Sequence, residues 1–180
     1  ALANDDNTTS DNVAVGYNAL NANTTGTRNV AAGWKSLEAI TSGHNNTGLG
    51  YMAGDSITTG LRNTIVGSAS GGGITTGDRN TVMGYAAATA LTTGERNVCI
   101  GNIVGGTLQT GSDNILLGYG ADVTAANASD EICIGGTAQT TFRLPGIQNG
   151  ASNGESAHEI GDFQVTGCKG TGSSSDQLTL

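Results

Sequence analysis

Residues 92–101 read Thr-Thr-Gly-Glu-Arg-Asn-Val-Cys-Ile-Gly, and the pattern of this stretch returns along the chain every 17 residues. Its asparagine recurs at seven positions, and a glycine follows each one four residues later. The asparagines are Asn12, Asn29, Asn46, Asn63, Asn80, Asn97 and Asn114. A unit this short cannot bury its own apolar side chains, so successive units must stack on one another, which predicts a solenoid.

The three residues between the asparagine and the glycine predict a short strand in every repeat. In chain order they read VAV, VAA, TGL, TIV, TVM, VCI, ILL and ICI, which are small or β-branched residues between turn-forming ones. A second, weaker strand is expected before the Thr-Thr-Gly turn, where an aliphatic column contains Ile40, Ile57, Ile74, Leu91 and Leu108. Two short strands and two turns leave no room for an ordinary helix. The predicted fold is therefore all-β: a parallel β-solenoid, or β-roll, of about eight 17-residue coils.

The asparagine and glycine columns are expected to mark the corners of the coil. Both residue types tolerate a positive φ, so stacking them lets every coil bend in the same place. Stacked Asn side chains also form hydrogen bonds from coil to coil. We therefore interpret the Asn column as an internal corner ladder in preference to a polar binding stripe.

The strands also predict a partner. Side chains alternate between the two faces of a strand, and the flanking pair, such as Val13 and Val15, is expected to face the interior. The middle residue should then point outward, although it carries no charge or hydroxyl in any repeat. Such an exposed apolar row needs a cover, and three rods around one axis provide it most simply. The predicted subunit interface is Ala14, Ala31, Ile65, Val82, Cys99, Leu116 and Cys133, with equivalent cysteines able to meet across the axis.

The chain divides into three predicted parts. Residues 1–11 are acidic and are expected to form an N-terminal arm or a partial coil, and residues 12–147 form the solenoid. Residues 148–180 are a Gly/Ser-rich C-terminal extension. This extension is expected either to cap the last coil or to assemble subunits by adding a strand to a neighbour's sheet edge.

Composition excludes several classes of partner. The net charge of −8 argues against nucleic acid and against anionic membrane surfaces. No stretch approaches the length of apolar sequence that inserts into a bilayer. The two histidines, His44 and His158, have no nucleophile motif nearby, and the glycines lack the Asp repeat of calcium-binding β-rolls. We expect no enzymatic activity, no cofactor and no metal.

Three surface columns could bind a ligand. The basic column contains Arg28, Arg62, Arg79 and Arg96, and we favour its neutralisation by Asp78 and Glu95 over binding of an anionic glycan. The aromatic column contains Tyr17, Trp34, Tyr51, Tyr85 and Tyr119, for which cover over the corner glycines is favoured over contact with a receptor sugar. A threonine column invites a remote ice-binding hypothesis; it contains Thr24, Thr41, Thr58, Thr75 and Thr92.

The repeats at residues 24–30 and 92–101 resemble those of the trimeric β-roll heads of trimeric autotransporter adhesins and bacteriophage tail fibres. Residues 132–142, followed by Leu144-Pro145-Gly146-Ile147, are similar to the exit from such a head in phage fibres. The resemblance covers roughly residues 8–147 and implies a homotrimeric parallel β-roll. Residues 148–180 depart from it, because they show neither a coiled-coil heptad nor a self-cleaving chaperone.

Two functions of different class follow. The first is a non-enzymatic, extracellular structural or adhesive module of a tail fibre or bacterial surface adhesin, which displays its side-chain columns for multivalent attachment to a cell-surface glycan or receptor. The second is a self-polymerising extracellular filament subunit joined through its terminal segments.

Overall fold

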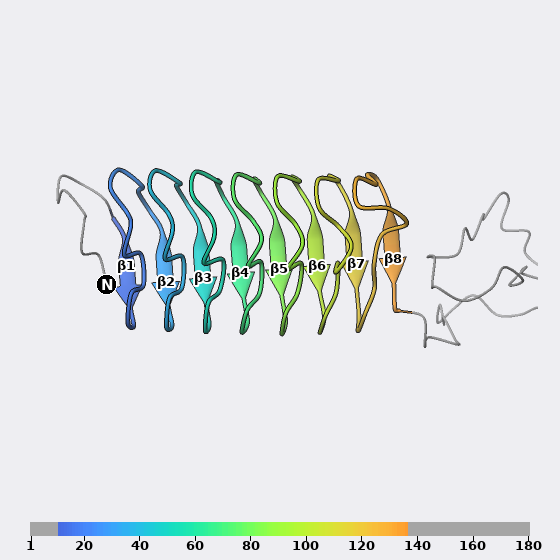
Figure 1. Ribbon diagram of the computed structural model, residues 1–180, viewed down its shortest axis with the longest axis horizontal. Coiled ribbons are helices and arrows are strands. Elements are labelled where there is room, and N and C mark those ends of the chain that lie inside the picture. The colour runs from blue at the N-terminus through green and yellow to red at the C-terminus, as the bar shows by residue number, and fades with distance from the viewer. Residues whose placement is uncertain (1–10, 137–180) are drawn as a thin grey trace, which may run out of the picture.

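The computed structural model describes residues 11–136, which form one rod of stacked coils (Figure 1). Each coil contributes a single three-residue strand, and the eight strands pair in parallel in chain order to make one sheet along the rod. The strands are β1 (Val13–Val15), β2 (Val30–Ala32), β3 (Thr47–Leu49), β4 (Thr64–Val66), β5 (Thr81–Met83), β6 (Val98–Ile100), β7 (Ile115–Leu117) and β8 (Ile132–Ile134). The predicted all-β solenoid is confirmed. The predictions for residues 1–10, 137–147 and 148–180 lie outside the described residues.

Pairing follows the 17-residue period without a slip. Val13 is paired with Val30, and Val98 with Ile115, so each strand residue lies against its equivalent in the next coil. A shift of one residue would turn every side chain to the opposite face of the sheet, which the buried columns forbid. Any residue type that recurs every 17 positions is therefore a physical column on the rod.

The expected second strand is wrong. Ile40, Ile57 and the rest of that aliphatic column are buried, but each directly follows a turn and belongs to no strand. Three positions before Ile40 and before Ile57, the backbone is left-handed, with φ of 50° at Leu37 and 61° at Gly54. An extended strand cannot contain such a residue, so this side of the coil bends repeatedly and pairs no second sheet.

The in–out assignment of the strands is also reversed. Middle residues of the predicted subunit interface lie in the core: Ala31, Ile65, Val82, Cys99, Leu116 and Cys133 are buried, and Ala14 packs against them. The flanking residues point outward, with Val15 62% and Ile132 67% exposed. The buried asparagine explains the reversal. Because alternate residues share a face, an Asn that points inward carries the middle strand residue inward with it.

The corner before each strand also differs from expectation. The left-handed residue is not the asparagine but the residue before it, as at Arg79 and Arg96, where φ is 57° at both. The glycine after the strand does have a positive φ, 137° at Gly84. The asparagine contributes to the corner through its side chain.

Candidate functional site

The buried asparagines form a continuous hydrogen-bonded ladder inside one corner of the coil. The Asn80 Oδ1 accepts from the Asn97 backbone N–H at 3.0 Å and from its Nδ2 at 3.1 Å. The Asn80 Nδ2 donates to the Gly94 carbonyl at 2.8 Å. The same scheme links Asn12 to the second coil and reaches Glu131, whose backbone N–H donates to Asn114. The corner-ladder interpretation is confirmed, and these side chains are not available to a ligand.

The outer face of the sheet is uncharged and mostly apolar along the described rod, with a threonine at the first position of β3, β4 and β5. Two columns form it, one on each side of the buried middle column, and we call them together the sheet face. None of the eight strands contains a charged residue. Large side chains that lie on the sheet face and are exposed are Val13, Val15, Val30, Leu49, Met83, Ile100, Ile115, Ile132 and Ile134. By strand dimensions it is roughly 40 Å long and roughly 10 Å wide.

A patch of this size is functional more often than not in a soluble protein. The apolar surface lies on the strands as expected, but on the two flanking columns and not on the middle column. The predicted interface residues, including Cys99 and Cys133, lie beneath the sheet face and cannot meet another subunit across an axis. Burial also raises the pKa of the free Cys99 thiol to about 12, which keeps it protonated and unreactive.

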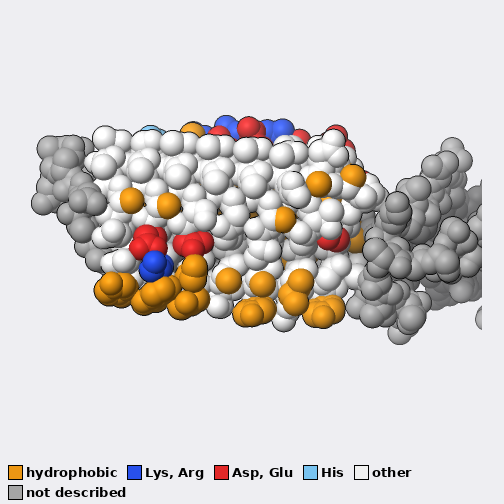
Figure 2. All heavy atoms as spheres, viewed as in Figure 1, with side chains coloured by type: hydrophobic (Ala, Val, Ile, Leu, Met, Phe, Trp, Pro, Cys, Tyr) orange, Lys and Arg blue, Asp and Glu red, His pale blue; other side chains and the backbone are white. Residues whose placement is uncertain are grey.

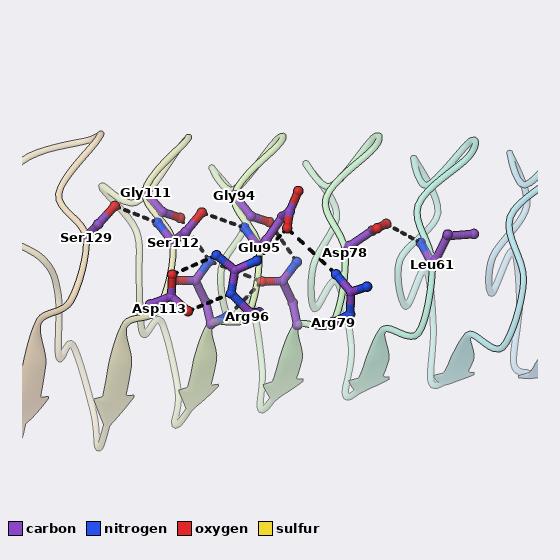
Figure 3. Close-up of polar contacts among 12 residues, drawn as sticks. Leu61, Asp78, Arg79, Gly94, Glu95, Arg96, Gly111, Ser112, Asp113 and Ser129 are labelled. Carbon is purple, nitrogen blue, oxygen red and sulfur yellow. Dashed lines mark hydrogen bonds and ion pairs between the residues drawn. The ribbon is translucent and has the colours of Figure 1, made fainter.

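The basic column is partly neutralised (Figure 3). Arg96 makes a bidentate contact with Asp113 in the next coil, at 2.6 Å from Nε to Oδ1 and 2.8 Å from Nη2 to Oδ2. Glu95 lies 2.7 Å from Arg96 and 3.8 Å from Arg79. Asp78 does not neutralise an arginine; its carboxylate accepts the Leu61 backbone N–H at 2.7 Å. Within the described residues, Arg28 and Arg62 have no ion pair.

These contacts shift two pKa values in opposite directions. Hydrogen bonding to Asp113 raises the pKa of Arg96, and the Arg96 guanidinium lowers the pKa of Asp113 below its ordinary 3.8. A lowered folded-state pKa means that Asp113 stabilises the fold above pH 3.8 and loses that contribution as the pH falls through the lowered value. Because the side chains are exposed to solvent, the contribution to stability is small.

Removing the guanidinium should therefore be visible in titration. We expect Arg96→Gln to raise the pKa of Asp113 toward its ordinary value, measured from the carboxyl carbon shift by NMR. Arg62→Gln is the matched control, since Arg62 has no ion pair in the described part of the chain, and it should leave the Asp113 pKa unchanged. An equal shift in both variants would contradict the pairing.

The aromatic column lies on the surface of the rod. Trp34 is stacked on Tyr51, with ring centroids 4.8 Å apart and planes at 6°, and Tyr17 is stacked more loosely at 6.2 Å. Lys35 lies over the Trp34 ring at 4.9 Å and pairs with Glu38 at 3.0 Å, which raises the pKa of the lysine. All five aromatic side chains are exposed, from 38% at Trp34 to 65% at Tyr17.

The threonine column joins successive coils by hydrogen bonds. Each hydroxyl donates to a backbone carbonyl 17 residues on, as from Thr24 to Thr41 and from Thr92 to Gln109, both at 3.0 Å. These hydroxyls bridge neighbouring coils.

Within residues 11–136, no group of three or more His, Cys, Asp or Glu side chains could hold a metal ion. The same residues contain no helix of the length and hydropathy needed to cross a bilayer. Comparison of the chain with protein-family models, curated proteins and solved structures found no match.

Proposed function

We propose that this chain is a structural module of an extracellular fibre or surface adhesin, in which three copies associate side by side through the sheet face. The observation that supports the proposal is the uncharged, mostly apolar sheet face that runs along β1 to β8. Parallel sheets are normally buried on both faces, and in the single chain this one is buried on only one.

A second copy of the same chain is the occupant that fits this surface. The sheet face is straight and narrow, and an identical rod has the same length and the same coil spacing. Closed symmetry is the usual way in which a chain buries such a surface against itself. Three narrow faces turned toward one axis are all covered at once, with the charged corners left in solvent.

The stacked coils suit a role in display. Backbone hydrogen bonds hold each coil on the next, as from Gly84 to Val66 and from Gly101 to Met83, both at 2.8 Å. Side-chain columns are therefore kept at a fixed spacing on a stiff support. Contacts that are weak in one coil and one subunit add together when several are made at once, which is the physical basis of attachment by a fibre.

A lysine in the sheet face tests the association. We expect wild-type protein to have the mass of three chains by light scattering, and Ile100→Lys or Met83→Lys to reduce it to one chain, because a charge would be buried at the axis. Thr93→Lys is the control, since Thr93 is exposed on a different part of the coil and should leave the mass unchanged.

Two results would count against the proposal. A monomeric wild-type protein would leave the sheet face without the occupant proposed for it. Long threads in negative-stain images, unaffected by the lysine variants, would favour a filament joined through other segments.

A further inference from the structure

The aromatic column is interrupted at two positions. In coil order it reads Tyr17, Trp34, Tyr51, Ser68, Tyr85, Asn102 and Tyr119. The residues that follow these seven positions are hydrogen-bonded from coil to coil: Ala69 donates to the Tyr51 carbonyl at 2.8 Å and Ala86 to the Ser68 carbonyl at 3.0 Å. Ser68 and Asn102 thus occupy the places of two missing rings. Figure 2 shows the hydrophobic side chains along the lower edge of the rod as a broken row.

Where rings occupy adjacent coils, they face along the rod. Trp34 and Tyr51 show this arrangement, with nearly parallel planes separated by one coil spacing. We extend this orientation to Tyr85 and Tyr119, so that a missing ring leaves its two neighbours two coils apart, roughly 9.5 Å between ring planes. Two slots result: the Ser68 slot, between Tyr51 and Tyr85, and the Asn102 slot, between Tyr85 and Tyr119.

We propose that each slot binds one pyranose ring of a neutral glycan, held between two tyrosine rings. Carbon atoms in contact lie about 3.5 to 4.0 Å apart, so the two walls take up about 7 to 8 Å of the gap. The remaining space, about 1.5 to 2.5 Å, is too wide for a flat aromatic ring to touch both walls. A puckered sugar ring with its axial C–H bonds is thicker than a flat ring and comes closer to filling it.

The polar groups around each slot match the same ligand. A pyranose presents C–H bonds on its faces and hydroxyl groups around its edge. The hydroxyl of Ser68 and the carboxamide of Asn102 lie between the tyrosines and have no hydrogen-bond partner among the described residues. They can therefore bond to the edge of a bound sugar while the tyrosine rings contact its faces.

Charge near the row favours a neutral sugar over an acidic one. Lys35 is already paired with Glu38, and burial is the main cause that raises the pKa of the Asp55 carboxyl nearby. Since Lys35 is paired and Asp55 is an acid, neither side chain is available as a cation for a sulfate or carboxylate. The arginines gather on the opposite, upper edge of the rod in Figure 2.

The inference names the partner of the proposed display module and rests on that function, although each slot is formed within one chain. The two slots are themselves two coils apart, so neighbouring parts of one linear glycan can enter both. Association of three chains multiplies the slots and strengthens attachment through multivalency.

Binding can be tested with a panel of neutral hexasaccharides: chitohexaose, cellohexaose and mannohexaose. Trp34 is the sole tryptophan and is stacked on the Tyr51 wall, so its fluorescence reports occupancy of the Ser68 slot, and calorimetry measures affinity. We expect at least one hexasaccharide to bind. Tyr85→Ala removes a wall shared by both slots and should weaken binding at least about tenfold.

Two further variants make the result specific. The double variant Ser68→Tyr with Asn102→Tyr fills both slots, and it should abolish binding while keeping the thermal transition at least as high as in wild type. Tyr17→Ala removes an exposed ring that walls neither slot and should bind as wild type does.

The proposal is overturned if no hexasaccharide binds at millimolar concentration, or if Tyr85→Ala binds normally. Binding confined to a sulfated dextran and lost in Arg62→Ala would assign recognition to the basic column instead. Light scattering on the same samples separates the two proposals. A trimer that binds no sugar overturns only the slots, and a monomer that binds sugar overturns only the association.

Discussion

Gly84→Ala is expected to lower the free energy of unfolding by about 2 to 6 kcal/mol, the sum of backbone strain and overpacking. The glycine follows β5 with a φ of 137°, which alanine rarely adopts. A Cβ at this position would overlap the carbonyl oxygen of Gly101 and lie 2.7 Å from its carbonyl carbon. Both are backbone atoms of the next coil, so the contact cannot relax by a rotamer change. Urea unfolding monitored by circular dichroism measures the loss.

Gly120→Ala is the matched control. Gly120 also has a positive φ, 62°, but a Cβ added there would meet no atom within 4 Å. Alanine already adopts this conformation elsewhere in the rod, with a φ of 48° at Ala86. The control should cost only the backbone strain of a left-handed alanine, about 1 to 2 kcal/mol. Equal losses in the two variants would show that coil-to-coil contact at Gly84 is not what limits the fold.

Asn80→Ala is expected to cost about 2 to 5 kcal/mol, because it leaves several buried polar groups without partners at about 1 to 3 kcal/mol each. The Asn97 backbone N–H would lose its acceptor, and the Gly94 carbonyl would lose the donor that now lies at 2.8 Å. Both groups are in the next coil, so the damage lies between coils. The urea midpoint and hydrogen exchange at the Asn97 amide report it.

Asn127→Ala provides the comparison, since Asn127 is exposed and outside the ladder, and we expect its midpoint to match wild type. In a solenoid each coil is stabilised mainly by its neighbours, so a broken ladder can separate unfolding into two transitions. A single, unshifted transition in Asn80→Ala would mean that the ladder contributes little to the stability of the stack.

Much of the fold could be predicted because the repeat constrains every level of structure at once. The 17-residue period places Val98 beside Ile115 before any contact is known, and the pairing is observed as expected. The internal position of the Asn column followed from the same stacking. The buried Asn column could also have corrected the strand assignment. Asn97 and Cys99 lie on the same face of the chain, so a buried Asn97 predicts that Cys99 is buried too.

The candidate surfaces were less predictable. Strands such as Val98–Ile100 are apolar on both faces, so their pattern contains no alternation from which to choose the inner one. The aromatic column was visible as a row of residue types, with Ser68 and Asn102 as its gaps. Its ring orientation depends on how far each side chain turns along the rod, for which the sequence has no signal.

Periodicity alone therefore determined the stacked, parallel, in-register solenoid, because equivalent residues in successive coils must occupy equivalent places. Only the closed coil decided which side chains fill the narrow interior. That choice depends on the left-handed turns at residues such as Leu37, which bend the far side of the coil and eliminate a second sheet. It also depends on the Asn ladder, whose buried hydrogen bonds turn the middle residue of each strand inward and leave the sheet face exposed.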